Sequence, residues 1–265
     1  MMKKMLLPAL AVIALICGST WLFINKDKPM NDLTQTDPEL AEFWNNFISK
    51  EVQPHSNLNA KTRYLLLLAA HVATQSPEEF RLILNRALDD GVSPIEIKEA
   101  VYQTIPYAGM AKTYDFLLLT NRILSERGVK LPLAAQSTTT TNTRLEQGIR
   151  TQQEIFGTEH IDTMRANAPE ELIHIQDYLS ANCFGDYYTR TGLDIKTREL
   201  LTFATLASLG GTEAQMRAHV QGNLNVGNNR QLLLDAVTQL LPFIGYPRSL
   251  NAIAAINDIT SKQQG

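Results

Sequence analysis

Glu199 and His219 have the side-chain types and the spacing of a proton-transfer pair. Twenty residues separate them, and Gly210 and Gly211 lie between two stretches in which apolar residues recur at helical spacing. Two antiparallel helices joined at these glycines would bring the carboxylate and the imidazole together. Histidine is the side chain best suited to moving a proton near neutral pH. We therefore predict that Glu199 and His219 form a catalytic pair in a cleft between the two helices.

Three more polar side chains are candidates for substrate binding: Arg198, Arg248 and Asn223. An arginine can hold a carboxylate through paired hydrogen bonds, and Asn223 lies one helical turn after His219. Each candidate also has a structural interpretation. Arginines commonly lie solvated at helix ends, a helix-start glutamate such as Glu199 is favoured by the helix dipole, and His219 could be a surface histidine.

Helices must position these residues, and the segment 192–257 predicts four of them. Asp194 is placed to cap the first, and Gly210 and Gly211 end it. Thr212 followed by Gln215 has the pattern of a capping box at the start of the second. A third helix follows, and Pro247 begins the fourth. The expected fold class is all-α.

The sequence contains an internal duplication. The run KTRYLLLLAA from Lys61 parallels KTRELLTFAT from Lys196, and IPYAGMAKTYDFLLLTN from Ile105 parallels LPFIGYPRSLNAIAAIN from Leu241. The offset is 135 residues for the first pair and 136 for the second. A nearly constant offset indicates a repeated unit, whose copies should pack against each other to bury their apolar stripes. The domains we predict are a leader at 1–30, a first repeat at 31–130, a linker at 131–143 and a second repeat at 144–265.

The leader is predicted to be a targeting segment. Met1–Lys4 is basic, and Met5–Ile24 is a nearly continuous apolar run that is long enough for a membrane-spanning helix. A signal peptide and a retained N-terminal membrane anchor both fit, and Cys17 followed by Gly18 weakly suggests lipidation. In each case we expect the body of the protein to be exported, in the periplasm or anchored outside the cytoplasm.

Composition excludes several functional classes. Lys and Arg number 24 against 27 Asp and Glu, and no basic stripe is present, so we do not expect a nucleic-acid partner. Cys17 and Cys183 are the only cysteines, which rules out a disulfide framework in the body, where Cys183 is expected to be a buried inert thiol. No metal-ligand cluster, phosphate loop or dinucleotide motif is found, so no metal and no cofactor are expected.

Several dispersed motifs occur in an order that is typical of one family. They are FGDYYTRTGLDIKTREL from Phe184, AHV at Ala218–Val220, NVG at Asn225–Gly227 and PFIGYPRSLNA at Pro242–Ala252. Together they resemble the carboxymuconolactone decarboxylase family, whose fold is also that of alkylhydroperoxidase D. The resemblance implies an all-helical fold, homo-oligomers with sites near subunit contacts, and a small-molecule substrate. The chemistry that it implies is decarboxylation or thiol-dependent peroxide reduction.

The resemblance also assigns roles. Glu199 and His219 stand where the family has its acid and its histidine, whereas the first repeat has Tyr64 and Ile83 there. The first repeat is therefore interpreted as a degenerate structural partner. In a decarboxylase His219 would donate the proton, Glu199 would orient it, and the arginines would hold the substrate carboxylate.

Three functions remain open from the sequence. The first is a decarboxylase or related lyase acting on a small acidic lactone. The second is an alkylhydroperoxidase-like enzyme with peroxiredoxin-type activity, but the Cys-x-x-Cys of that branch is replaced by Gly210–Glu213, leaving Cys183 alone. The third is a non-catalytic binding or assembly protein. At Phe243 the family pattern and Tyr107 of the first repeat have tyrosine, so the two repeats are not equivalent there.

Overall fold

The structure is a computed structural model that describes residues 33–261, and every regular element in this range is helical. This confirms the predicted all-α class. Residues 1–43 and 44–265 cluster into two units, and both repeats have their core in the larger one. The predicted leader at 1–30 lies outside the described residues. Within 33–261 no helix is both long enough and apolar enough to cross a membrane.

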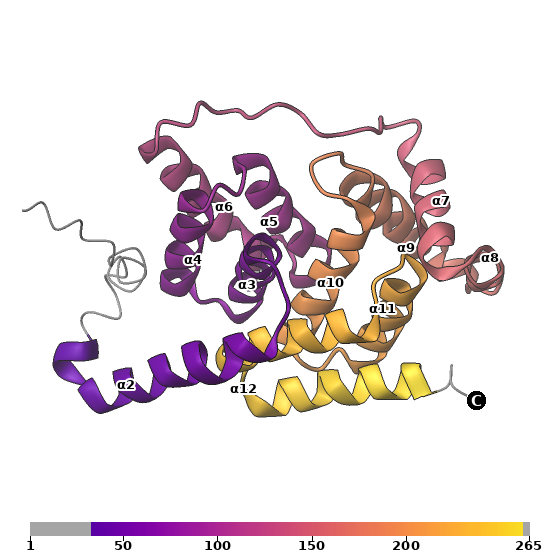
Figure 1. The fold of residues 1–265 in the computed structure, drawn as a ribbon. Coiled ribbons are helices and arrows are strands. Elements are labelled where there is room, and N and C mark those ends of the chain that lie inside the picture. Colours follow the sequence, from indigo (N-terminus) through magenta and orange to yellow (C-terminus); the bar gives the residue numbers. More distant parts are fainter. Residues whose placement is uncertain (1–32, 262–265) are drawn as a thin grey trace, which may run out of the picture. The chain divides into compact units, whose positions relative to one another are not determined.

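The two repeats have the same order of elements (Figure 1). Each begins with a π-helical segment and continues through four helical stretches. In the first repeat these are η1 (Phe47–Val52), α3 (Ala60–Thr74), α4 (Pro77–Asp89), α5 (Pro94–Ala108) and α6 (Met110–Glu126). In the second they are η4 (Leu179–Tyr188), α10 (Ile195–Leu209), α11 (Glu213–Asn225) and α12 (Arg230–Ser261), which is broken in two at Gly245. The elements α2 (Pro38–Asn46), η2 (Gln53–His55), α7 (Arg144–Phe156), α8 (Thr158–Ala166), η3 (Glu170–Leu172) and α9 (Ile173–Tyr178) complete the described chain.

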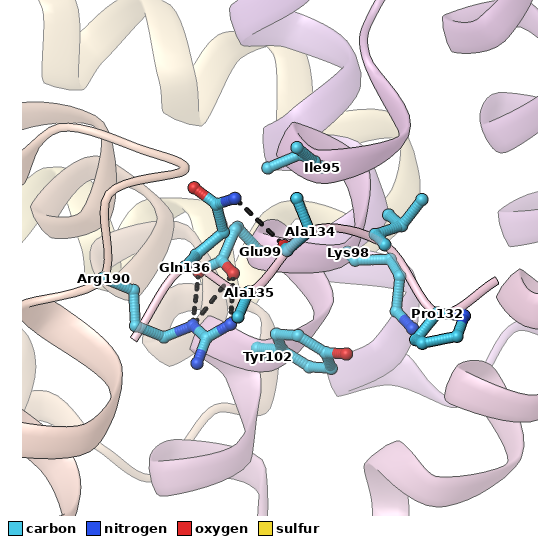
Figure 2. A pocket seen from close by; sticks show the side chains of 10 residues that line it. Ile95, Lys98, Glu99, Tyr102, Pro132, Ala134, Ala135, Gln136 and Arg190 are labelled. Atoms are coloured by element: carbon cyan, nitrogen blue, oxygen red, sulfur yellow. Dashed lines mark hydrogen bonds and ion pairs between the residues drawn. The ribbon is translucent and has the colours of Figure 1, made fainter. Parts of the chain in front are cut away.

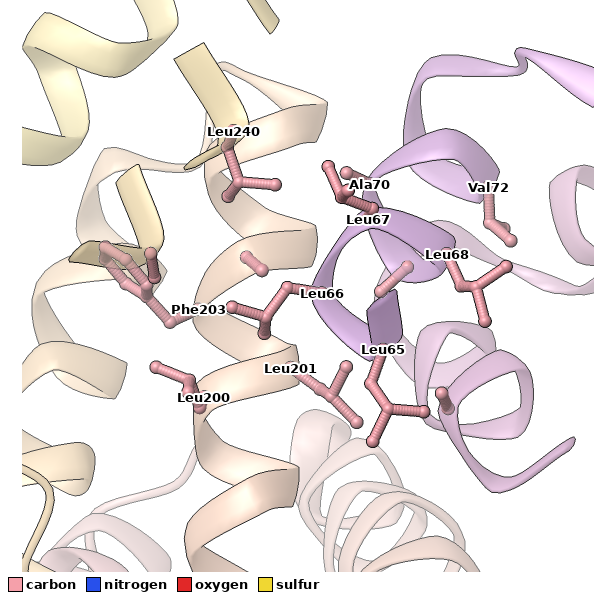
Figure 3. Close-up of a cluster of buried hydrophobic side chains, with 14 of the residues drawn as sticks. Leu65, Leu66, Leu67, Leu68, Ala70, Val72, Leu200, Leu201, Phe203 and Leu240 are labelled. Carbon is pink, nitrogen blue, oxygen red and sulfur yellow. The ribbon is translucent and has the colours of Figure 1, made fainter. Parts of the chain in front are cut away.

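Helices α3 and α10 pack against each other at the centre of one shared core. Figure 3 shows Leu65 and Leu66 of α3 facing Leu200 and Leu201 of α10, with Phe203 and Leu240 nearby, whereas Leu68 points to the other side of α3. Ten of the 15 residues of α3 and 11 of the 15 residues of α10 are buried, so both helices are covered around most of their circumference, as expected of central helices. The repeats therefore form one packed pair, as predicted from the duplication.

Local signals explain where the helices near the site begin. The Asp194 carboxylate accepts a hydrogen bond from the Thr197 backbone N–H at 2.8 Å, which confirms the predicted cap of α10. The predicted capping box at Thr212 is wrong. Its hydroxyl instead donates to the Leu206 carbonyl at 2.8 Å and so closes the α10–α11 turn, and the side chain makes no cap hydrogen bond.

Two glycines allow α7 and η4 to approach at backbone distance. A Cβ atom on Gly148 would lie 1.8 Å from the Ser180 carbonyl oxygen, and one on Gly185 would lie 2.1 Å from that of Arg144. Neither contact could be relieved by a side-chain rotation. The two glycines therefore allow η4, which carries Cys183 and Tyr188, to pack directly against the backbone of α7.

Replacing Gly148 with alanine is expected to lower the free energy of unfolding by about 2 kcal/mol. Overpacking against a backbone carbonyl costs about 3 kcal/mol, and the higher helix propensity of alanine returns about 1. Urea unfolding measures the change, with Glu146→Ala at an exposed position of α7 as the control. A Gly148→Ala protein as stable as the parent would show that the α7–η4 contact is not close-packed.

The threonine-rich segment between α6 and α7 is extended (Figure 1) but attached to the second repeat. The Thr138 hydroxyl donates to the Thr189 carbonyl at 2.9 Å, and that of Thr139 donates to Gly185 at 3.0 Å. The Thr191 backbone N–H donates to the Gln136 carbonyl at 3.0 Å. The segment thus fastens the residues that follow η4.

Candidate functional site

Glu199 and His219 meet inside the second repeat. Nδ1 of His219 lies 2.9 Å from Oε2 and 3.2 Å from Oε1 of Glu199, which confirms the predicted proximity. Glu199 is 0 % exposed and His219 7 % exposed. A carboxylate only accepts hydrogen bonds, so Nδ1 carries the shared proton and Nε2 is the ring nitrogen left for chemistry. Nε2 has no hydrogen-bond partner among residues 33–261.

Two aromatic rings pack against the imidazole of His219. Tyr107 of α5 and Phe156 at the end of α7 each lie edge-on to the His219 ring, with centroids 5.4 Å away. Gly222 makes room for Glu199 and Phe156, because a Cβ atom on Gly222 would lie 2.6 Å from Glu199 Oε2 and 3.0 Å from the Phe156 ring. The imidazole of His219 is therefore packed against aromatic side chains.

A tyrosine hydroxyl also contacts the Glu199 carboxylate and is itself contacted by a second tyrosine. The Tyr188 hydroxyl, which η4 supplies, lies 2.7 Å from Glu199 Oε1, 2.7 Å from the Thr202 hydroxyl and 3.0 Å from the Tyr107 hydroxyl. The Cys183 thiol donates to the Tyr107 hydroxyl at 3.5 Å. Burial raises the pKa of both tyrosines well above the ordinary value, so they remain protonated.

Arg198, predicted to bind substrate, is fully buried between the repeats. Its guanidinium donates to the Glu99 carboxylate at 2.9 Å, to the Gln103 side-chain oxygen at 3.0 Å and to the backbone carbonyls of Leu193 and Arg190. These four partners are residues other than Glu199 and His219. Burial lowers its pKa, and the Glu99 carboxylate opposes that shift.

The other two predicted binding residues lie in different places. The buried Asn223 amide donates to the backbone carbonyls of Glu199 at 3.0 Å and His219 at 2.7 Å, so it ties α10 to α11 directly at the pair. Arg248 lies at the α10–α11 turn, its Nε 3.1 Å from the position of a Cβ on Gly210. No contact in the described part of the chain joins Arg248 to the pair. Substrate binding by Arg198, Arg248 and Asn223 stays a prediction.

Sequence reasoning missed Tyr188, Phe156 and the part played by Tyr107. Tyr188 lies within the FGDYYTRTGLD stretch that carries the family resemblance, which was the available signal. For Tyr107 the available signal was that the equivalent position of the second repeat, Phe243, has no hydroxyl. Its place beside His219 could not be read from the sequence, because the contact crosses from one repeat to the other.

A separate cavity of about 200 Å³ lies between α5, the 131–143 segment and Arg190 (Figure 2). Arg190 donates to both oxygens of Glu99 at 2.9 Å, and its guanidinium lies 5.2 Å from the Tyr102 ring centroid. The cavity is lined by Glu99 rather than by either member of the His219–Glu199 pair. Residues 33–261 contain no group of three or more His, Cys, Asp or Glu side chains that could hold a metal ion.

Comparison with known proteins agrees with this architecture. The model of the carboxymuconolactone decarboxylase family matches the chain twice, at residues 38–122 and 174–258. The chain belongs to the carboxymuconolactone decarboxylase family. Within this family it is 27 % identical over 116 residues to 4-carboxymuconolactone decarboxylase of Acinetobacter baylyi, covering 44 % of this chain and 86 % of that protein.

Two further proteins are similar to this chain. Nitrosuccinic acid decarboxylase of Metarhizium robertsii is 26 % identical over 123 residues, covering 44 % of this chain and 84 % of that protein. A crystal structure from Burkholderia xenovorans, described as a gamma-carboxymuconolactone decarboxylase subunit, superposes with a TM-score of 0.51 at 18 % identity. It covers 91 % of this chain and 93 % of that one, so its fold extends over both repeats.

Proposed function

We propose that this member of the family is a decarboxylase of a small carboxylic acid, such as an acidic lactone. The observation that carries the proposal is His219, whose Nδ1 is held by the buried Glu199 and whose Nε2 is unpartnered beside two aromatic rings. The two curated relatives support it, since both are named as decarboxylases. Their names describe acids that also carry an electron-withdrawing lactone or nitro group.

The site can supply the proton that such a reaction needs. When the carboxylate leaves as carbon dioxide, the electron pair of the broken carbon–carbon bond stays on the substrate and is delocalised into its electron-withdrawing group. A proton on Nε2 of His219 is then transferred to that carbon, and water reprotonates Nε2. Glu199 keeps the ring in one orientation throughout. The rings of Tyr107 and Phe156 keep the surroundings apolar, which favours loss of the charged carboxylate as neutral carbon dioxide.

Cys183 gives no support to peroxide reduction. The thiol is 4 % exposed, and burial raises its pKa to about 12, so the reactive thiolate is not formed near neutral pH. Cys183 is the only cysteine among residues 33–261, so no second thiol in this range could form a disulfide with an oxidised Cys183.

A panel of carboxyl-labelled small acids tests the proposal. Lactone acids, nitro acids and keto acids would each be incubated with the protein while release of labelled carbon dioxide is measured. Hydroperoxides with a thiol reductant would be assayed in parallel. We expect carbon dioxide release from at least one class, without any need for reductant. Hydroperoxide reduction alone would establish the peroxidase instead, and acid binding by calorimetry without turnover would establish a binding protein.

A further inference from the structure

Helix α5 of the first repeat contributes hydrogen-bonding side chains to the site of the second. Tyr107 reaches the Tyr188 hydroxyl at 3.0 Å, and the Gln103 amide nitrogen reaches the Thr202 hydroxyl at 3.2 Å. Thr202 in turn lies 2.7 Å from Tyr188, which is 2.7 Å from Glu199. Two routes from α5 therefore converge on one phenol next to the carboxylate.

The direction of these hydrogen bonds follows from donor and acceptor capacity. Glu199 can only accept, so the single Tyr188 proton is donated to it. The Tyr188 oxygen must then accept from both Tyr107 and Thr202. At the far end Arg198 can only donate, so Gln103 presents its oxygen to Arg198 and its nitrogen to Thr202.

In two series of hydrogen bonds, each group donates its proton to the next group on the way to the Glu199 carboxylate. One series runs from Cys183 through Tyr107 to Tyr188, and the other runs from Arg198 through Gln103 and Thr202 to the same phenol. Hydrogen bonds aligned in this way polarise one another, and a low-dielectric interior strengthens the effect. His219 Nδ1 lies 3.2 Å from Glu199 Oε1, the oxygen that also accepts from Tyr188, and 2.9 Å from Oε2. The orientation of the carboxylate, and with it that of the imidazole, therefore depends on both series.

We propose that Tyr107 and Gln103 are positioning residues, through which the first repeat holds the Glu199–His219 pair of the second. Their link to turnover rests on the decarboxylase function proposed above. The reciprocal arrangement is absent, because Phe243 has no hydroxyl and packs edge-on against His71 with centroids 5.1 Å apart. Tyr64, the counterpart of Glu199, instead donates to Asp90. The duplication thus yields one working site, completed within the chain by the repeat that lost its own pair.

Tyr107→Phe tests the proposal because it removes only the hydroxyl and keeps the ring beside His219. The readout is the Nδ1 proton resonance of His219, observed by NMR in histidine-labelled protein and assigned with His219→Gln. We expect this resonance to shift or broaden in Tyr107→Phe, and turnover to fall about 10-fold with a changed pH profile. The matched control is Tyr114→Phe, which alters an exposed tyrosine of α6 and should change neither.

Gln103→Glu provides a second variant of nearly the same shape. Its carboxylate would accept from Arg198 and also from Thr202, which turns the Thr202 proton away from Tyr188. We expect the same direction of change in the His219 resonance. Parental resonances in both variants would overturn the positioning role. If the resonances change but the parent releases no carbon dioxide from any acid, the positioning role stands and the decarboxylase function fails.

Discussion

Replacing His219 with glutamine is expected to lower the rate of decarboxylation by about 10²-fold or more, the usual effect of losing a general acid. Glutamine can still donate to Glu199, but its amide cannot deliver a proton to carbon. The fold should persist, because the residue adds little to the apolar core. Circular dichroism and thermal melting check that point, and turnover of the most active acid in the panel measures the effect.

His160→Gln is the matched control, since His160 is an exposed histidine of α8. It should turn over at the parental rate. Glu199→Gln should resemble His219→Gln in effect, because the carboxylate accepts from both Tyr188 and His219. A folded His219→Gln protein with parental turnover would refute the catalytic assignment.

Replacing His71 with leucine is expected to make the free energy of unfolding less sensitive to acid pH. His71 lies on α3, is 1 % exposed, and has no hydrogen-bond partner at either ring nitrogen among residues 33–261. Burial lowers its pKa to about 4 from the ordinary 6.5. As the pH falls from 6.5 toward 4, the unfolded chain takes up the proton first, so the folded state loses about 3 kcal/mol of relative stability over this window.

Urea unfolding at several pH values between 7 and 4 measures this effect. The parent should lose more stability than His71→Leu as the pH falls, by about 3 kcal/mol at the acid end. Leucine is the matched substitution, because Leu206 stands at the equivalent position of α10. Carboxylates that titrate in the same range are common to both proteins and cancel in the difference. Parallel curves would show that His71 takes up its proton at about the same pH in the folded and unfolded states, which would contradict its desolvation in the core.

Much of the fold could be predicted because its signals are local. Apolar spacing placed α10 and α11, the Asp194 carboxylate marked the start of α10, and the duplicated segments gave the pairing of repeats. The contact between Glu199 and His219 followed from the length of two helices and one turn. Thr212 failed as a cap because its hydroxyl had a competing acceptor, the Leu206 carbonyl, across the turn.

The rest of the site depends on contacts across the duplication. Glu99, which accepts a hydrogen bond from Arg198, lies 99 residues away from it on α5. Tyr107 meets Tyr188 across 81 residues of chain. No periodicity encodes such pairings, since they arise only when α3, α5 and α10 pack together. Sequence patterns could therefore predict that Glu199 and His219 lie together but could not predict the hydrogen bonds from Tyr188 and its neighbours.

The origin of the proton added to the product tests the central claim most directly. Decarboxylation in deuterated water, with a substrate whose reacting carbon becomes CHD, reports the face on which the proton arrives. If Nε2 of His219 delivers it, the product should carry one deuterium on a single face, and residual reaction in His219→Gln should lose that preference. A racemic label from the parent enzyme, or an unchanged single-face label from His219→Gln, would contradict the account.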